Sequence, residues 1–259
     1  MNNDNRNDKS IHEFDFQLIC EYFSSIQRQG PGSDEMTRKA LGLVTGLDSQ
    51  SVIADLGCGT GSQTLQLALC SPARVKALDL FPMFIDALRI RCLKAGVADR
   101  VEGQVGDMAE LPFDCHSLDV IWSEGAIYNI GFQKGIALWY EYLKAGGWLV
   151  VSEATWFTDE RPEEIEKFWL EAYPEIDTVR NKVKQMEEAG YHDVATFNLP
   201  KECWTVEYYE KQKEAQRIFL ERYPDSHTAK ELVANQRREA ELYDRYHDFY
   251  GYTFFIGRI

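Results

Sequence analysis

The sequence predicts an α/β protein with a doubly wound, mostly parallel sheet, and three observations support this prediction. Short apolar runs alternate with longer amphipathic stretches from residue 52 to about residue 153. The first of these runs is almost wholly apolar, as is typical of a strand buried on both faces of a parallel sheet. Acidic residues and glycines follow the ends of the runs, at the edge where an open α/β sheet binds its ligands.

The loop after the first expected strand carries the strongest signal in the chain. Residues 52–56 form an apolar run that contains Asp55. Three glycines follow at alternate positions: Gly57, Gly59 and Gly61. They permit positive φ and leave no Cβ between the backbone and a ligand. Residues 62–70, among them Thr64, are expected to form a helix with free N–H groups at its start, which indicates a nucleotide-sized cradle. A tight turn without a ligand is the alternative.

The spacing of this loop departs from the dinucleotide-binding pattern G-x-G-x-x-G. Ser62 stands where the third glycine would be, and Asp55 lies two residues before Gly57. The arrangement D-x-G-x-G-x-G resembles motif I of the class I methyltransferases, which use S-adenosylmethionine (SAM). This cofactor has no pyrophosphate, and it ends in an amino acid whose cationic amine lies beside a sulfonium. The carboxylate of Asp55 is therefore expected to attract that amine, directly or through water.

A second acid ends the next expected strand, residues 74–80. Asp79 lies about 20 residues beyond the glycine loop, where a nucleotide-binding fold places a carboxylate for the ribose hydroxyls. A helix cap is the alternative role for Asp79. Leu80, which follows it, can supply an apolar wall for adenine.

A third acid follows the expected strand 101–105, in the segment Gly106-Asp107-Met108. The resemblance implies that Asp107 accepts a hydrogen bond from the adenine amino group and that the Met108 N–H donates to the ring. An aspartate that merely forms a turn after Gly106 is the alternative.

The segment after the expected strand 118–122 should face the methyl group, because ligands bind beyond the carboxyl ends of such strands. Ser123 and Glu124 are candidate contacts to the methionine part of the cofactor, and Glu124 and Tyr128 are candidates to touch the substrate. Glu153 ends the fifth strand, so it faces the substrate pocket or caps the following segment. A general base is needed only if the attacking atom carries a proton, and Glu124, Tyr128 and Glu153 are the candidates.

The resemblance extends from about residue 50 to residue 153. Its further elements are L-P-F at 111–113 and the Gly146-Gly147 turn before the fifth strand, in the family's order. Within the family the chain is most similar to the ubiquinone/menaquinone C-methyltransferase-like group, which acts on small molecules, and it is also similar to bacterial members with R-Q-G-P-G-S and S-E-G-A-I-Y-N-I-G segments. The resemblance implies a Rossmann-like methyltransferase fold: seven strands, an antiparallel last strand and a helical lid insertion.

We expect one domain in three parts. Residues 1–45 hold a disordered tail to about residue 10, N-terminal helices and a Gly-Pro-Gly lid loop, for which a simple turn is the alternative. Residues 46–153 form the SAM-binding core. Residues 154–259 form substrate-side helices, the lid insertion and the last two strands, and their aromatic residues favour an apolar or aromatic small substrate. The helices outside the glycine-loop unit are expected at 12–27, 34–44, 82–95, 136–143, 162–172, 178–189, 204–222 and 228–247.

Composition narrows the function classes. The net charge of −14 argues against a nucleic-acid partner, because an acidic surface repels phosphate backbones. Six cysteines without C-x-x-C spacing favour reduced thiols and a cytoplasmic location over disulfides or a zinc site. No apolar stretch approaches about 20 residues, so no membrane span is expected. The histidines have no spacing that suggests a metal.

Two other functions remain open from the residues alone. An NAD(P)-dependent oxidoreductase would use the same architecture, although Ser62 and Asp55 count against it. A non-catalytic SAM-binding protein would share the cofactor site. The aromatic helices of the last part could also serve a homodimer interface instead of a lid.

Overall fold

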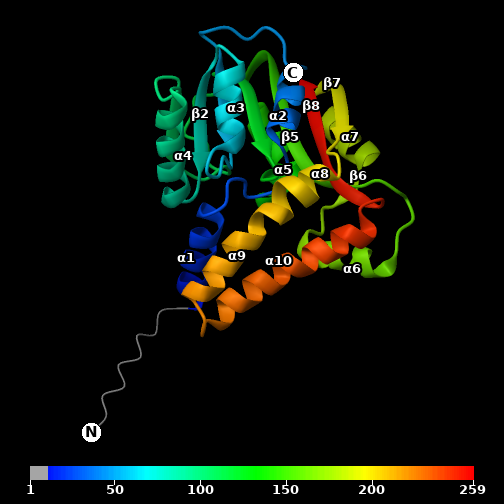
Figure 1. Ribbon diagram of the computed structural model, residues 1–259. Helices are drawn as coiled ribbons and strands as arrows, with labels where there is room; N and C mark the ends of the chain where they lie inside the picture. The colour runs from blue at the N-terminus through cyan, green and yellow to red at the C-terminus, as the bar shows by residue number, and fades with distance from the viewer. Residues whose placement is uncertain (1–10) are drawn as a thin grey trace.

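The computed structural model describes residues 11–259, so the expected disordered tail lies outside the described residues. One central sheet organises the molecule, with strands in the order β3-β2-β1-β4-β5-β8-β7 (Figure 1). The strands are β1 (Val52–Leu56), β2 (Arg74–Asp79), β3 (Val101–Val105), β4 (Leu118–Glu124), β5 (Leu143–Trp156), β6 (Asp177–Thr178), β7 (His192–Asn198) and β8 (Tyr250–Arg258).

The strand directions agree with the sequence prediction. Strands β1 to β5 run parallel to one another, while β8 is antiparallel to both β5 and β7. The two-residue β6 pairs with the end of β5, outside the seven-strand order. The mostly parallel sheet with an antiparallel last strand is therefore confirmed.

Helices cover both faces of the sheet because successive strand residues point to opposite sides. Ile53 and Val120 pack with α2, α3 and α4 on one face, and Ala54 and Ile121 pack with α5 and α7 on the other. The helices are α1 (Ile11–Ser24), α2 (Asp34–Leu41), α3 (Ser62–Cys70), α4 (Pro82–Ala95), α5 (Phe132–Tyr140), α6 (Glu163–Ala172), α7 (Val179–Glu188), α8 (Glu202–Trp204), α9 (Lys211–Arg222) and α10 (His227–Tyr246). None of these helices within residues 11–259 has both the length and the apolar character needed to cross a bilayer.

A separate helical layer lies below the sheet in Figure 1. There α9 and α10 run side by side and α1 packs against them through its own apolar cluster, which includes Tyr22, Phe219 and Val233. Apart from α1, this layer comes from the segment between β7 and β8, where the sequence predicts a helical insertion. Its first part is helical throughout 202–222, as expected at 204–222, but a π-helical turn, η2 (Thr205–Glu210), lies between α8 and α9.

The bounds predicted for the helix at 136–143 are wrong, since α5 spans Phe132–Tyr140. Gly131 adopts φ +87°, and the Glu175 carboxylate accepts from the Phe132 N–H (2.9 Å), so the helix begins four residues early. Leu143 already pairs with Leu118 in the sheet. The expected Gly146-Gly147 turn consequently lies inside β5, as an irregularity at which Gly146 has φ +76°.

Candidate active site

The glycine loop joins the end of β1 to the start of α3 in a conformation that depends on glycine. Its three glycines have φ values of +71°, +54° and +88° at Gly57, Gly59 and Gly61. A Cβ on Gly57 would lie 2.4 Å from the Ala126 Cβ, and one on Gly61 would lie 2.1 Å from a Leu88 methyl. The loop therefore approaches its neighbours more closely than any side chain would allow.

Asp55 lies fully buried behind this loop, against the first turn of α3. Its carboxylate accepts from the Thr64 hydroxyl (2.5 Å) and from the Gln63 amide (3.3 Å). Burial, with smaller contributions from the carboxylates of Glu124 and Asp79, raises the Asp55 pKa to about 7. Thr64 thus orients Asp55, and contact of either residue with a cofactor amine stays a prediction.

The raised pKa of Asp55 leads to a first testable result. The folded state favours neutral Asp55, whereas the unfolded chain ionises it above about pH 4, so this group lowers stability progressively as pH rises towards 7. Asp55→Asn removes that cost while keeping an acceptor for Thr64. The difference in unfolding free energy between Asp55→Asn and wild type should therefore shift in favour of the variant by about 2.5 kcal/mol between pH 5 and pH 8.

Urea unfolding at the two pH values measures this gain, with the exposed Asp86→Asn on α4 as the control. Equal differences from wild type at both pH values would show that Asp55 is ionised in the folded state.

Asp79 connects the end of β2 to the glycine loop. One carboxylate oxygen accepts from the Gly59 N–H (2.8 Å) and the other from the Phe81 N–H (3.1 Å). Burial raises the Asp79 pKa, and its side chain lies beside Leu80, which is 54% exposed. Asp79 thus ties the end of β2 to the glycine loop, and the contacts of Asp79 with ribose and of Leu80 with adenine stay predictions.

The segment Gly106-Asp107-Met108 lies at the neighbouring strand end. The Asp107 carboxylate is exposed and accepts from the Ala109 N–H (2.8 Å), which is a turn-type bond. The Met108 carbonyl accepts from the Trp139 indole (2.9 Å), and a Cβ on Gly106 would lie 2.7 Å from a Leu78 methyl. These contacts hold the loop in place, and its adenine contacts stay predictions.

Glu124, at the end of β4, is held by three donors. Arg28 pairs with one oxygen (2.9 Å), while Thr37 (2.7 Å) and the Trp122 indole (3.0 Å) donate to the other. The neighbouring Ser123 is buried and donates to the Leu56 carbonyl (2.9 Å), so it braces β4 against β1. Arg28 and Thr37 were not singled out by sequence reasoning, which placed Arg28 in a loop and Thr37 in the helix expected at 34–44.

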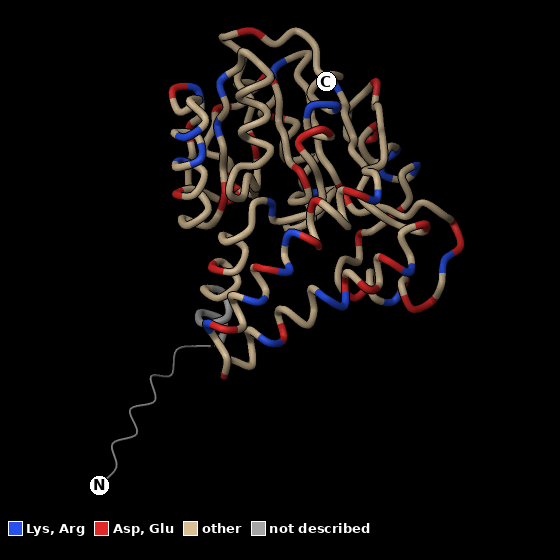
Figure 2. The backbone as a smooth tube through the Cα atoms, viewed as in Figure 1, with Lys and Arg blue, Asp and Glu red and all other residues tan. Residues whose placement is uncertain are grey.

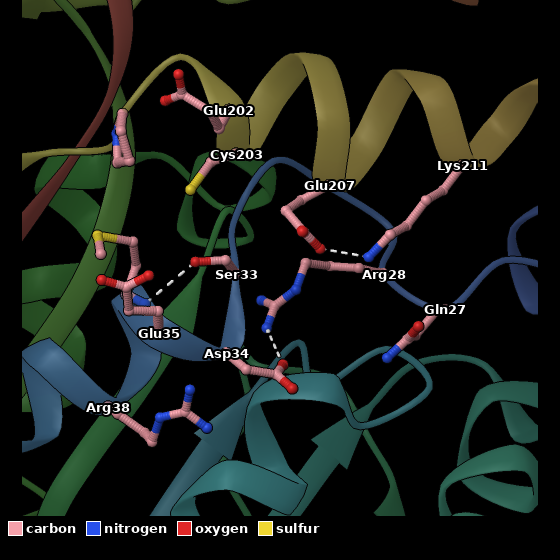
Figure 3. Close-up of a pocket in the computed structure, with 12 residues that line it drawn as sticks. Gln27, Arg28, Ser33, Asp34, Glu35, Arg38, Glu202, Cys203, Glu207 and Lys211 are labelled. Carbon is pink, nitrogen blue, oxygen red and sulfur yellow. Dashed lines mark hydrogen bonds and ion pairs between the residues drawn. The ribbon is translucent and has the colours of Figure 1, made fainter.

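The segment before α2 rests on the glycine loop. The Gln29 amide oxygen accepts from the Thr60 N–H (3.0 Å), and its nitrogen donates to the Phe23 and Ile26 carbonyls. A Cβ on Gly59 would lie 2.2 Å from this amide oxygen. Next to this contact, a cavity of about 450 Å³ opens between α2 and η2, with Arg28 reaching Asp34 in its wall (Figure 3). The segment before α2, for which the sequence predicts a lid loop or a simple turn, therefore packs against the glycine loop.

Glu153 lies within β5 on the face covered by α5 and α7. It is 1% exposed, and its oxygens accept no hydrogen bond from residues 11–259. The fully buried Lys182 ammonium lies 3.9 Å away, donates to the Tyr173 hydroxyl (3.2 Å) and stacks over the Phe132 ring. Burial raises the Glu153 pKa to about 7 and lowers the Lys182 pKa. Lys182 gave no sequence signal, since it belongs to an ordinary helical pattern, and Tyr173 was only one of the aromatic residues noted after residue 154.

Tyr128 is the most solvent-exposed of the three predicted catalytic residues. It is 44% exposed on η1 (Ile127–Asn129), and its ring lies 6.0 Å from that of Tyr173. Burial raises the Tyr128 pKa. Glu124, Asp55 and Asp79 are brought together around the glycine loop, whereas Glu153 is separated from solvent.

Comparisons with known proteins identify the class that this fold and loop define. Residues 53–147 match the family model of the methyltransferase domain. Residues 53–147 therefore carry a methyltransferase domain, in agreement with the resemblance to the class I SAM-dependent methyltransferases.

Among curated relatives, the ubiquinone/menaquinone biosynthesis C-methyltransferase UbiE of Geobacter sp. strain M21 is 29% identical over 125 residues, which cover 47% of this chain and 53% of that protein. The biotin biosynthesis bifunctional protein BioHC of Teredinibacter turnerae is 30% identical over 145 residues, covering 51% of this chain and 24% of that protein. The chain thus spans about half or less of the length of these relatives.

Solved structures share the whole fold. A SAM-dependent methyltransferase from Geobacter sulfurreducens, in complex with S-adenosylhomocysteine (SAH), has a TM-score of 0.81 at 22% identity, covering 93% of this chain and 97% of that one. YjhP from E. coli has a TM-score of 0.81 at 24% identity, covering 93% and 98%.

Proposed function

We propose that this protein transfers a methyl group from SAM to a small, apolar or aromatic molecule. The observation that supports this most is the hydrogen bond from the Gly59 N–H to Asp79, because it joins the glycine loop to the acid that ends β2. A cradle of bare backbone beside a carboxylate suits an adenosyl group. The methyltransferase relatives, and the SAH in the Geobacter sulfurreducens structure, support the same cofactor.

The residues of this chain fit the cofactor along its length. Asp79 would accept from the ribose hydroxyls, Leu80 would cover adenine, and Asp107 would accept from the adenine amino group. The ion pair of Arg28 with Glu124 supplies both charges that a zwitterionic amino-acid end requires. When bound, the cofactor supplies a methyl group already activated by a sulfonium, so orientation by the chain is the main contribution to rate.

Tyr128 is our choice for the residue that contacts the substrate and handles its proton. Its exposed ring follows β4, where the methyl group is expected. Glu124 already accepts three hydrogen bonds and Glu153 is buried, so both fit a positioning role better than a base. Residues 154–259 would form the substrate side of the site.

Arg28→Ala tests the zwitterion assignment. We expect SAM affinity to fall by about ten-fold or more, because a charge-assisted contact is lost and Glu124 is left without its cation. Calorimetric titration with SAM measures the change. The control is Arg38→Ala on α2, because the guanidinium of Arg38 donates to Gln66 on the surface. An unchanged SAM affinity in Arg28→Ala would contradict the assignment.

The proposed activity is tested in two steps. Calorimetry should show that the protein binds SAM and SAH but not NAD; preferential binding of NAD would favour the oxidoreductase. Incubation with methyl-labelled SAM and a small-molecule fraction of a bacterial extract should then label a product below about 1 kDa. Tight SAM binding without a labelled product from any fraction would favour a non-catalytic SAM-binding protein.

We propose in addition a cytoplasmic location and no nucleic-acid partner. The six cysteines without C-x-x-C spacing support the location, and the charge of −14 supports the second point. Acidic and basic positions alternate along the lower helices in the view of Figure 2. The layer of α9 and α10 could serve as a homodimer interface instead of a lid. Light scattering would detect such a dimer.

A further inference from the structure

The π-helical turn η2 directs two successive tyrosines towards the interior. A π-helical turn accommodates an extra residue, so neighbouring side chains can share a face, and such turns are frequent at functional sites. The buried Tyr208 donates to the Gln29 carbonyl (3.2 Å), beside the glycine loop. Tyr209 donates to a carboxylate oxygen of Glu239 on α10 (2.9 Å). The turn therefore connects the segment over the glycine loop with an acid of the helical layer.

Glu239 contacts Tyr209 directly and lies near a wider group of tyrosines. Its carboxylate is near enough to raise the pKa of each of them by its charge. They come from η1, η2 and β8: Tyr128, Tyr208, Tyr209, Tyr250 and Tyr252. Burial is the main cause that raises the pKa of Glu239 itself. An acid in this position costs free energy that an incoming cation would offset.

The group adjoins the strand end where the methyl group is expected. The Tyr252 ring lies over Gly125, directly after β4, so close that a Cβ there would be 2.8 Å from it. Trp204 packs edge-on against Tyr252 (4.9 Å) and stacks on Tyr243 (4.4 Å), which holds the ring in place. Tyr128 is the member of the group that is exposed, so a ligand would reach the group from solvent at this residue.

The charges around this group are not balanced. Both Glu239 and Glu153 act on Tyr128 and Tyr252. The neighbouring cations have other partners: Arg28 pairs with Glu124 and Asp34, Lys182 pairs with Glu153, and Arg237 donates to Gln216. Within residues 11–259, Glu239 itself forms no ion pair.

We propose that Glu239 and the rings of Tyr128 and Tyr252 bind a quaternary or protonated ammonium group of the substrate, which stands beside the atom that accepts the methyl group, because a cationic nitrogen has no lone pair with which to attack it. Aromatic faces attract cations through the ring quadrupole, and a partly buried carboxylate adds a counter-ion. This assignment rests on the proposed function, because it takes the bound cation to be part of the substrate. It narrows the apolar or aromatic substrate to one that carries a positive charge.

Two isosteric probes test the proposal: choline, and 3,3-dimethylbutan-1-ol, in which carbon replaces the charged nitrogen. Ligand-observed NMR titration of the SAH-saturated protein should show choline binding about ten-fold more tightly. Glu239→Gln keeps an acceptor for Tyr209 and should remove most of this preference, leaving the neutral probe unchanged. The control is Glu241→Gln, which removes the same charge from an exposed position of the same helix and should keep the preference.

Tyr128→Leu provides a second variant, which removes a ring without touching a charge and should also weaken choline binding. Equal binding of the two probes to wild type, or an unchanged preference in Glu239→Gln, would overturn the proposal. SAH affinity is measured separately for every variant. A protein that binds no SAH contradicts the proposed function, whereas the choline preference, repeated without SAH, tests the cation site by itself.

Discussion

Asp79→Ala should lower the affinity for SAM by about 100-fold while the protein stays folded. The carboxylate of Asp79 is expected to accept from both ribose hydroxyls, and two charge-assisted hydrogen bonds contribute about 3 kcal/mol together. The same carboxylate accepts from the Gly59 and Phe81 N–H groups, so its loss also loosens the cradle. Calorimetric titration with SAM and SAH measures the change.

Two variants separate these contributions. Asp79→Asn keeps one acceptor for the backbone and should lose less affinity than the alanine variant. Asp86→Ala removes an exposed aspartate of α4 and should bind SAM as wild type does. If Asp79→Ala bound SAM with wild-type affinity, the adenosyl group could not lie at the end of β2.

The largest effect on stability is expected for Lys182→Met. The fully buried Lys182 compensates Glu153, whose carboxylate accepts no hydrogen bond from the described part of the chain. Removing the cation leaves a buried carboxyl alone, which costs about 3 kcal/mol of unfolding free energy. Since the folded-state pKa of Glu153 is already raised to about 7, the wild type loses stability from this group as pH rises through that value.

In Lys182→Met the Glu153 pKa rises further, so the loss continues to higher pH and the gap from wild type should be wider at pH 8.5 than at pH 6. Urea unfolding at both pH values measures the gap. The double variant Glu153→Gln/Lys182→Met should recover most of the stability at pH 8.5. A gap of the same size at both pH values would mean that Glu153 does not respond to Lys182.

Local patterns in the sequence predict most of the sheet and its glycine loop. The strand at 52–56 and the helices at 62–70 and 82–95 match the structure, because apolar periodicity and glycine stops act over a few residues. The bounds of α5 were wrong because the Glu175 carboxylate, 43 residues away, accepts from its first N–H. A contact over that separation leaves no local signal.

In the candidate site, too, local motifs could be predicted from the sequence and contacts between distant residues could not. Asp55, Asp79 and the glycines could be predicted because motif spacing reports them. The partners of Glu124 could not, since Arg28 and Thr37 lie 96 and 87 residues before it in the chain. Glu239 belongs to a helix that looks solvated in the sequence, and its position beside the tyrosines follows from the η2 turn and the packing of α10.

A crystal structure of the protein with SAH tests the central claim most directly. Our account predicts SAH across the carboxyl ends of β1, β2 and β4, with its ribose hydroxyls on Asp79, its amino-acid end beside Arg28 and Glu124, and its sulfur towards Tyr128. SAH bound away from Asp79 and the glycine loop would contradict it.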